Sequence, residues 1–168
     1  MLDEIRSVGK VNVEHFVSAY ALAAIPSRYA LERGRWAEAA GLTLSPSEFP
    51  WSRFPQSEAI LVFARGLGAA RSGDVAAARR DFARLQSFAE ALTSAKQGYW
   101  AEQVEIQRRV VSAWVARAEG KNEEALTLMR AAADLEDSTE KSPVTPGSIV
   151  PARELLGEML LEMGQPAQ

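Results

Sequence analysis

The sequence contains no cysteine and only one histidine, His15. Without cysteine the chain cannot form a disulfide, a thiolate zinc site or a thiol nucleophile. Neither a Ser-His-Asp partner set nor a multi-histidine metal site can be built around His15, which we interpret as a residue at the start of a helix. We therefore predict that the chain is not an enzyme and has no catalytic residue, metal site or cofactor.

Long apolar runs and an excess of positive charge are also missing. The longest apolar stretches, such as residues 19–25, are much shorter than the roughly 18 to 20 residues that cross a bilayer. The first residues include Asp3 and Glu4, where a signal peptide carries positive charge. The net charge is −3, with lysine and arginine spread along the chain, so we expect no nucleic-acid partner. These features predict no membrane span and a cytoplasmic location.

β-Branched residues are few compared with alanine. The chain has 29 alanines against 12 valines, 5 isoleucines and 5 threonines. Alanine is the best helix former, whereas β-branched residues favour strands. The hydrophobic fraction of 47% and charged fraction of 24% are typical of globular proteins, and 168 residues can bury a core without disulfides or metals. We predict an all-α fold and a single domain over residues 1–168.

A short pattern recurs in which a glycine separates two helical segments. The glycines are Gly34, Gly73, Gly120 and Gly164, separated by 39, 47 and 44 residues. Glycine directly after a helix can adopt the left-handed conformation that closes the helix, and Asp74 or Asn122 could then cap the next one. In the first three copies an alanine (Ala39, Ala78 or Ala125) follows the glycine by five residues and would let two helices approach closely. The pattern predicts repeated helix pairs.

The predicted helices leave two long, proline-rich connections. The helices are expected at residues 12–33, 35–42, 56–72, 74–95, 98–119, 121–137 and 151–163. In the connection over residues 43–55, we expect Phe49, Trp51 and Phe54 to pack on the helices. The connection over residues 138–150 cannot be helical throughout. Within the third helix, Gly66 and Gly68 indicate a close helix contact, since no strand precedes them as in a phosphate-binding loop.

These residues resemble the tetratricopeptide repeat family, whose unit is a helix-turn-helix of about 34 residues. The best match is the last copy, with Leu156-Gly157, then Leu160 and then Gly164 at the turn. The second copy is also similar, and its matching residues are Gly66, Ala69, Gly73, Ala78, Phe82 and Leu85. The resemblance covers nearly the whole chain and implies a right-handed α-α superhelix. It says little about function, because one fold hosts many functions.

More narrowly, three segments look like the C-terminal part of a longer bacterial tetratricopeptide protein with no defined activity. The segments are residues 99–104, 143–147 and 151–157. The family comparison implies that the fourth repeat is incomplete, because the second helix after Gly164 is missing. The apolar stripe of the last helix would then lack its usual cover, unless another segment or a second copy of the chain covers it. The stripe consists of Leu155, Leu156, Met159, Leu160 and Met163.

The family resemblance also implies a binding surface on the concave side, which the first helix of each pair lines. In this chain the corresponding residues are Arg28, Phe63, Arg71, Gln107, Trp114, Arg117, Glu154 and Glu158. Aromatic side chains with mixed charges would suit an extended or helical peptide, and the arginines could bind carboxylates. The alternative interpretation is that these side chains only fill the space between repeats.

We expect a scaffold that binds a protein or peptide partner. A first alternative is a capping or dimerisation module, in which the incomplete fourth repeat forms a homodimer. A weaker alternative is a sensor of a small ligand or cation that uses residues 134–147. That segment begins with an acidic cluster of Asp134, Glu136, Asp137 and Glu140, whose spacing differs from a calcium-binding loop and fits a solvated helix end better.

Overall fold

The computed structural model describes residue 4, residues 7–9, residue 11 and the ranges 14–139 and 147–165. In these residues the chain forms seven α-helices and one short 3-10 helix, and no β-strand is present. The helices are α2 (Phe16–Glu32), α3 (Trp36–Ala40), η1 (Trp51–Arg53), α4 (Pro55–Arg71), α5 (Val75–Ser94), α6 (Gly98–Ala118), α7 (Asn122–Ser138) and α8 (Ala152–Glu162). The prediction of an all-α fold is confirmed.

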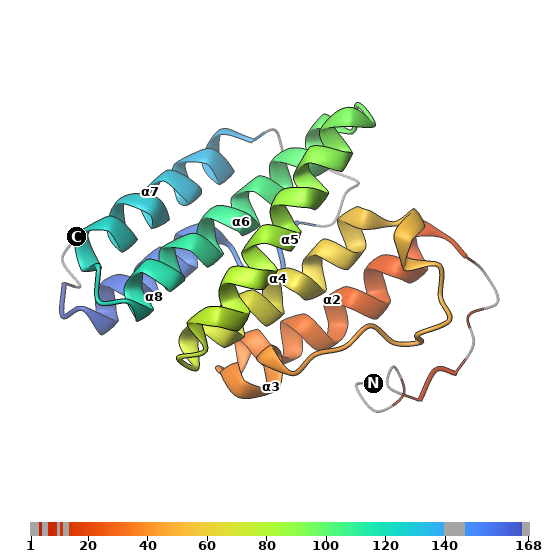
Figure 1. Cartoon of the computed structure of the whole chain (residues 1–168), viewed down its shortest axis with the longest axis horizontal. Helices are drawn as coiled ribbons and strands as arrows, with labels where there is room; N and C mark the ends of the chain where they lie inside the picture. Colours follow the sequence, from red (N-terminus) through yellow and green to blue (C-terminus); the bar gives the residue numbers. More distant parts are fainter. Residues whose placement is uncertain (1–3, 5–6, 10, 12–13, 140–146, 166–168) are drawn as a thin grey trace.

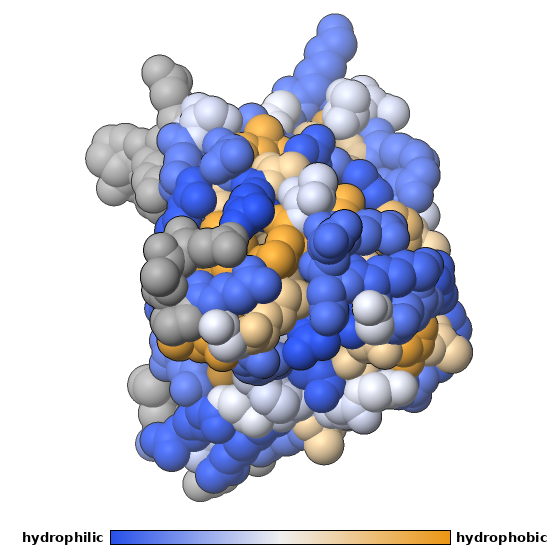
Figure 2. Space-filling model, turned by 90° about the vertical axis from the view of Figure 1, so that its left-hand side faces the viewer, coloured by the Kyte–Doolittle hydropathy of each residue, from blue (hydrophilic) through white to orange (hydrophobic). Residues whose placement is uncertain are grey.

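Successive helices pack as a chain of antiparallel pairs. The first helices α2, α4, α6 and α8 contact one another in this order, and α3, α5 and α7 each pack between two of them. Figure 1 shows α2 and α3 at one end of the molecule and α7 and α8 at the other. Hydrophilic side chains cover most of the α7 and α8 end, with smaller apolar areas among them (Figure 2).

The four glycines of the repeat close helices as expected. Their φ angles lie between 61° and 86°, in the left-handed region. At Gly73, the glycine N–H donates to the carbonyl of Ala70, and the N–H of Asp74 donates to the carbonyl of Ala69. This pair of hydrogen bonds defines a Schellman motif. Lys96 adopts the same conformation between α5 and α6, with a φ of 59°. Regular turns of one type therefore join most of the described helices, and among these turns the one at Lys96 lacks glycine.

Of the two residues predicted to cap the helix after a glycine turn, Asp74 does so and Asn122 does not. The Asp74 carboxylate accepts a hydrogen bond from the Ala77 N–H at 2.9 Å and caps α5. Asn122 does not cap α7. It is the first residue of that helix, and its side-chain oxygen accepts from Arg117 at 3.0 Å. The His15 ring caps α2 by accepting from the Val17 N–H at 3.3 Å, which confirms its expected place at a helix start.

Small residues set the distance between paired helices. Ala39, Ala78 and Ala125 are fully buried, as expected for close helix contacts. Gly68 of α4 lies directly under α3, because a Cβ atom there would be 2.6 Å from the Trp36 carbonyl oxygen and from the Ala40 nitrogen. The predicted close contact at Gly68 is therefore confirmed, and it holds Trp36 against the last turn of α4.

The connection between α3 and α4 packs on the helices through its aromatic residues. Phe49 and Trp51 are buried, and the two rings lie 4.9 Å apart. The Trp51 indole N–H donates to the Pro46 carbonyl at 2.9 Å. In the second connection, residues 140–146 with Glu140 and two prolines lie outside the described part of the chain.

The apolar stripe of α8 is not an open edge. Leu155, Leu156, Met159 and Leu160 are buried in the core, and Met163 packs partly against it. The packing partners are α7 and α6 of the same chain. The expectation of an uncovered stripe is therefore wrong, and the reason for predicting a homodimer through it disappears. No helix of the described residues is long and apolar enough to cross a membrane.

Candidate functional site

The residues predicted for the concave side all belong to the first helices α2, α4, α6 and α8. We call the surface that they form the inner face. The structure groups them at two ends of this face. Arg28, Phe63 and Gln107 surround a segment of the chain itself, whereas Trp114, Arg117 and Glu158 gather around the largely covered guanidinium of Arg71. Glu154 is exposed on α8 and belongs to neither group.

Residues 147–151, which we call the strap, lie across the first end of the inner face. The Tyr20 hydroxyl donates to the Gly147 carbonyl at 3.1 Å, and Arg28 Nε donates to the Ile149 carbonyl at 3.3 Å. The Ile149 side chain is only 4% exposed. Side-chain donors on α2 therefore hold the main chain of the strap, while an aliphatic anchor fills the space below it.

The space below the strap has apolar walls and polar atoms without partners. Phe63 and Gln107 line a small cavity with Ile149, and Gln56 and Tyr20 line a second one beside it. The Oε1 atoms of Gln56 and Gln107 are buried and accept no hydrogen bond from the described residues. Burial raises the pKa of Tyr20, and the nearby Arg28 charge opposes this rise.

The strap continues directly into α8, and a buried carboxylate binds the main chain at this junction. Glu136 of α7 is buried, and its Oε2 atom accepts from the Ala152 N–H at 2.6 Å at the start of α8. This bond satisfies one of the free N–H groups of the helix start. The interpretation of Glu136 as part of a solvated helix end is therefore wrong.

Asp134 and Asp137, the other described residues of the acidic cluster, both pair with Arg153. Asp134 accepts from Arg153 at 3.0 Å, and Asp137 also accepts from Arg153. Among the described residues, no group of three or more metal-ligating side chains could hold a metal ion.

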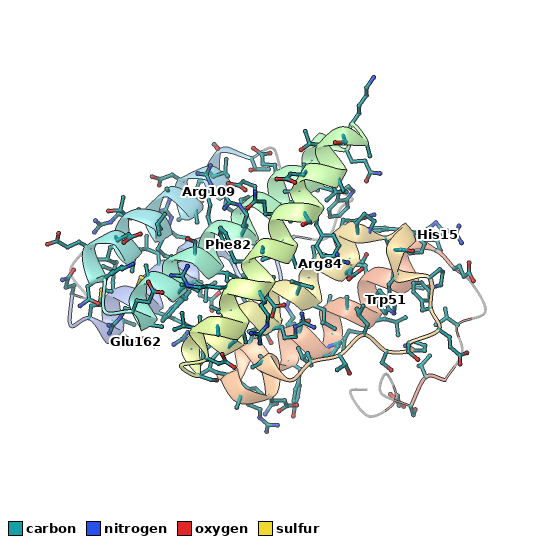
Figure 3. The ribbon with its side chains drawn as sticks, in the orientation of Figure 1. His15, Trp51, Phe82, Arg84, Arg109 and Glu162 are labelled. Atoms are coloured by element: carbon teal, nitrogen blue, oxygen red, sulfur yellow. The ribbon has the colours of Figure 1, made fainter. Side chains whose placement is uncertain are left out.

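At the second end of the inner face, Arg71 lies between two indole rings. Its guanidinium carbon is 3.7 Å from the centre of the Trp36 ring and 4.1 Å from that of Trp114. The same guanidinium pairs with Glu158 and Glu162 of α8, and the side chain is only 9% exposed. Figure 3 shows Glu162 at the end of the molecule opposite His15 and Trp51. One side chain thus connects α3, α4, α6 and α8.

A pocket of about 260 Å³ opens beside this cluster. Arg71, Trp114 and Arg117 line it together with Glu162. Arg117 donates to Asn122, while its Nε and the Trp114 indole nitrogen are buried without an acceptor among the described residues. Glu158 and Glu162 already engage the charge of Arg71, whereas Arg117 has no carboxylate partner among the described residues.

Sequence reasoning missed Tyr20 and Gln56, although a signal for both was present. Tyr20 lies eight residues before Arg28 on α2, and Gln56 lies seven residues before Phe63 on α4. Residues seven or eight apart share one face of a helix. Extending the predicted inner face by two helical turns toward the N-terminal ends of α2 and α4 would therefore have found both residues.

Charged residues on the opposite surface pair mainly with each other. Glu105 of α6 accepts from Arg108 at 2.6 Å and from Arg109 at 2.8 Å. Burial alone would raise the pKa of Glu105, but the two arginines outweigh it and lower the pKa below its ordinary value. Between α4 and α5, Arg65 forms a two-point pair with the buried Asp81, and hydrogen bonds from this pair raise the pKa of Arg65.

Comparison of the chain with protein-family models, with curated proteins and with solved structures finds no match.

Proposed function

We propose that this chain is a tetratricopeptide-like scaffold that binds an extended segment of a partner protein on its inner face. The observation that carries the proposal is the strap, because the inner face already holds a non-helical segment of the chain by its main chain and one aliphatic side chain. Repeated helix pairs closed by left-handed turns, with the first helices in one continuous layer, support the tetratricopeptide-like arrangement.

The contacts with the strap define what a partner segment would need. Tyr20 and Arg28 donate to main-chain carbonyls, so they recognise the backbone of a non-helical segment rather than a particular side chain. Gln56 and Gln107 offer acceptors that N–H groups of a bound segment could use. The cavity filled by Ile149 selects a branched aliphatic residue as the anchor. A partner would have to displace the strap before it binds.

The test is a selection from a displayed library of random peptides on the wild-type protein and on an Ile149→Asp variant. A carboxylate is costly in this apolar cavity, so we expect the strap of the variant to leave the inner face. Peptides with a branched aliphatic anchor should then bind the variant at least about tenfold more tightly than the wild type, because the strap no longer competes.

A second substitution places the peptide on the inner face. In the Ile149→Asp background, the change Arg28→Ala should weaken peptide binding several-fold, whereas Arg33→Ala should leave it unchanged. Arg33 is a matched control because it follows the same helix and is exposed. If the folded Ile149→Asp variant selects no peptide, or if Arg28→Ala has no effect on those selected, the proposal is wrong.

A further inference from the structure

A groove lies on the surface opposite the strap, between residues 40–44, α4 and α5. It has a volume of about 540 Å³, and we call it the arginine groove because Arg65, Arg80 and Arg84 line it. Buried Leu61 and Val62 form its floor. Figure 3 shows Arg84 on α5, beside α4. None of the residues predicted for the inner face belongs to this groove.

One wall of the arginine groove is main chain that pairs with none of the described residues. Residues 42–44 are neither helix nor strand, and they line the groove directly. Within the described part of the chain, the backbone N–H and carbonyl groups of Thr43 and Leu44 make no hydrogen bond. Such a free edge can pair with the backbone of an added extended segment.

The opposite wall carries guanidinium groups that differ in how they are held. Arg65 is fixed by the buried Asp81, so it keeps its place in the groove. Arg84 contacts Glu58 at 3.2 Å, and its side chain is half exposed, which makes this pair easy to exchange. Arg80 is exposed and makes no ion pair with the described residues. The groove holds three guanidinium groups against the two carboxylates of Glu58 and Asp81.

The spacing of Arg80 and Arg84 matches an extended ligand. Four residues of α-helix rise about 6 Å. In an extended chain, residues two positions apart lie about 6.6 to 6.8 Å apart and point to the same side. Two carboxylates at alternate positions of an extended segment can therefore each reach one of these arginines, while the intervening residues face the other way.

We infer that the arginine groove binds an extended segment of another protein that carries acidic residues at alternate positions. The backbone of this segment pairs with Thr43 and Leu44, and its carboxylates pair with Arg80 and Arg84. The site is independent of the proposed binding at the inner face, since the two surfaces share no residue.

The test uses fluorescence anisotropy with a labelled peptide of alternating glutamate and valine on the full chain. The double change Arg80→Glu and Arg84→Glu should weaken its affinity at least about tenfold, since two charge-assisted contacts are lost and replaced by repulsion. Arg79→Glu is the matched control and should change affinity less than about twofold, because Arg79 pairs with Glu119 outside the groove. If the variant with both charges reversed fails to fold, the double change Arg80→Gln and Arg84→Gln should also weaken the affinity for the peptide at least about tenfold.

Two further peptides and an oligonucleotide test the chemistry of the ligand. A peptide of alternating glutamine and valine should bind at least about tenfold more weakly, because it keeps the shape without the charge. A peptide with its glutamates in one block should bind several-fold more weakly, because its carboxylates lack the alternate spacing. Equal affinity for the glutamate and glutamine peptides, or for the wild type and the double variant, would overturn the inference. Equally tight binding of a single-stranded oligonucleotide would overturn it too.

Discussion

Helix α4 carries arginines in two regions of the molecule whose surroundings differ sharply. On the inner face, Arg71 is enclosed by Trp36 and Trp114 and pairs with two glutamates of α8. In the arginine groove, Arg65 pairs with one carboxylate, and its side chain is 36% exposed. Both arginines are therefore held by carboxylates of the fold, and in the groove the exposed Arg80, which makes no ion pair with the described residues, is the one that can serve a ligand.

The largest effect is expected from Arg71→Ala. This change leaves Glu158 and Glu162 without their cation and opens a gap between two indole rings, so we expect a loss of about 3 kcal/mol in unfolding free energy. Urea unfolding followed by circular dichroism measures it. Arg71→Lys keeps the charge but not the planar fork, and should recover only part of the loss. A change below about 1 kcal/mol for Arg71→Ala would contradict the structural role of this residue.

The next effect concerns Gly68, which lets α3 hold Trp36 over Arg71. A Cβ atom at this position meets two backbone atoms at 2.6 Å, so Gly68→Ala must push α3 away. We expect a loss of about 2 kcal/mol, even though alanine favours the helix. Gly157→Ala is the control, because a Cβ atom there meets nothing within 4 Å and the helix should gain stability slightly. Equal effects of the two changes would show that α3 and α4 are not in close contact.

In the arginine groove, Arg65 and Arg80 should differ in their effect on stability. Arg65→Ala leaves the buried Asp81 carboxylate without its cation, and we expect a loss of about 1.5 to 3 kcal/mol. Arg80→Ala should stay within about 0.5 kcal/mol, as for most exposed substitutions. Thermal unfolding of both variants measures the difference. A destabilising Arg80→Ala would mean that Arg80 also stabilises the fold and is not free for a ligand.

The smallest effect is a pH dependence of stability from Glu105 of α6, which lies on the surface opposite the inner face. Its pKa is lowered in the folded state, so its ion pairs add stability that is complete above its ordinary pKa of 4.5 and is lost as the pH falls through the lowered value. The melting temperature of Glu105→Gln should lie below that of the wild type at neutral pH, by a few degrees at most. This gap should close in acid. A gap that is independent of pH would show that Glu105 acts through packing alone.

Much of the local structure was predictable because short-range patterns encode it. The recurring glycines mark the helix ends, since the left-handed conformation at Gly34, Gly73 and Gly120 costs other residues more. Lys96 adopts this conformation as well, and the position of its turn followed from helical periodicity alone. Helix boundaries depend on neighbours only a few residues away, so composition and spacing placed most of them to within two residues; the exception is α2, which was expected from residue 12 and begins at Phe16.

The inner face was predictable only in part. Spacing placed Phe63 and Trp114 on first helices, but whether that surface is open depends on the strap, which comes from more than thirty residues further along the chain. The position of the strap results from long-range hydrogen bonds of Tyr20 and Arg28 that no local pattern contains. The same reason explains why the α8 stripe, expected to need a cover, is buried by α6 and α7.

Alanine content, glycine spacing and helical periodicity were sufficient for the all-α class and for most boundaries of the helix pairs, because these properties arise from interactions within a few residues. Which charged side chains are buried and which face water followed only from packing. Arg65, Arg71 and Arg80 look alike in the sequence, and their different surroundings result from helices that approach one another across the whole chain. Burial is a property of that assembly, since it depends on what the rest of the chain places around each side chain.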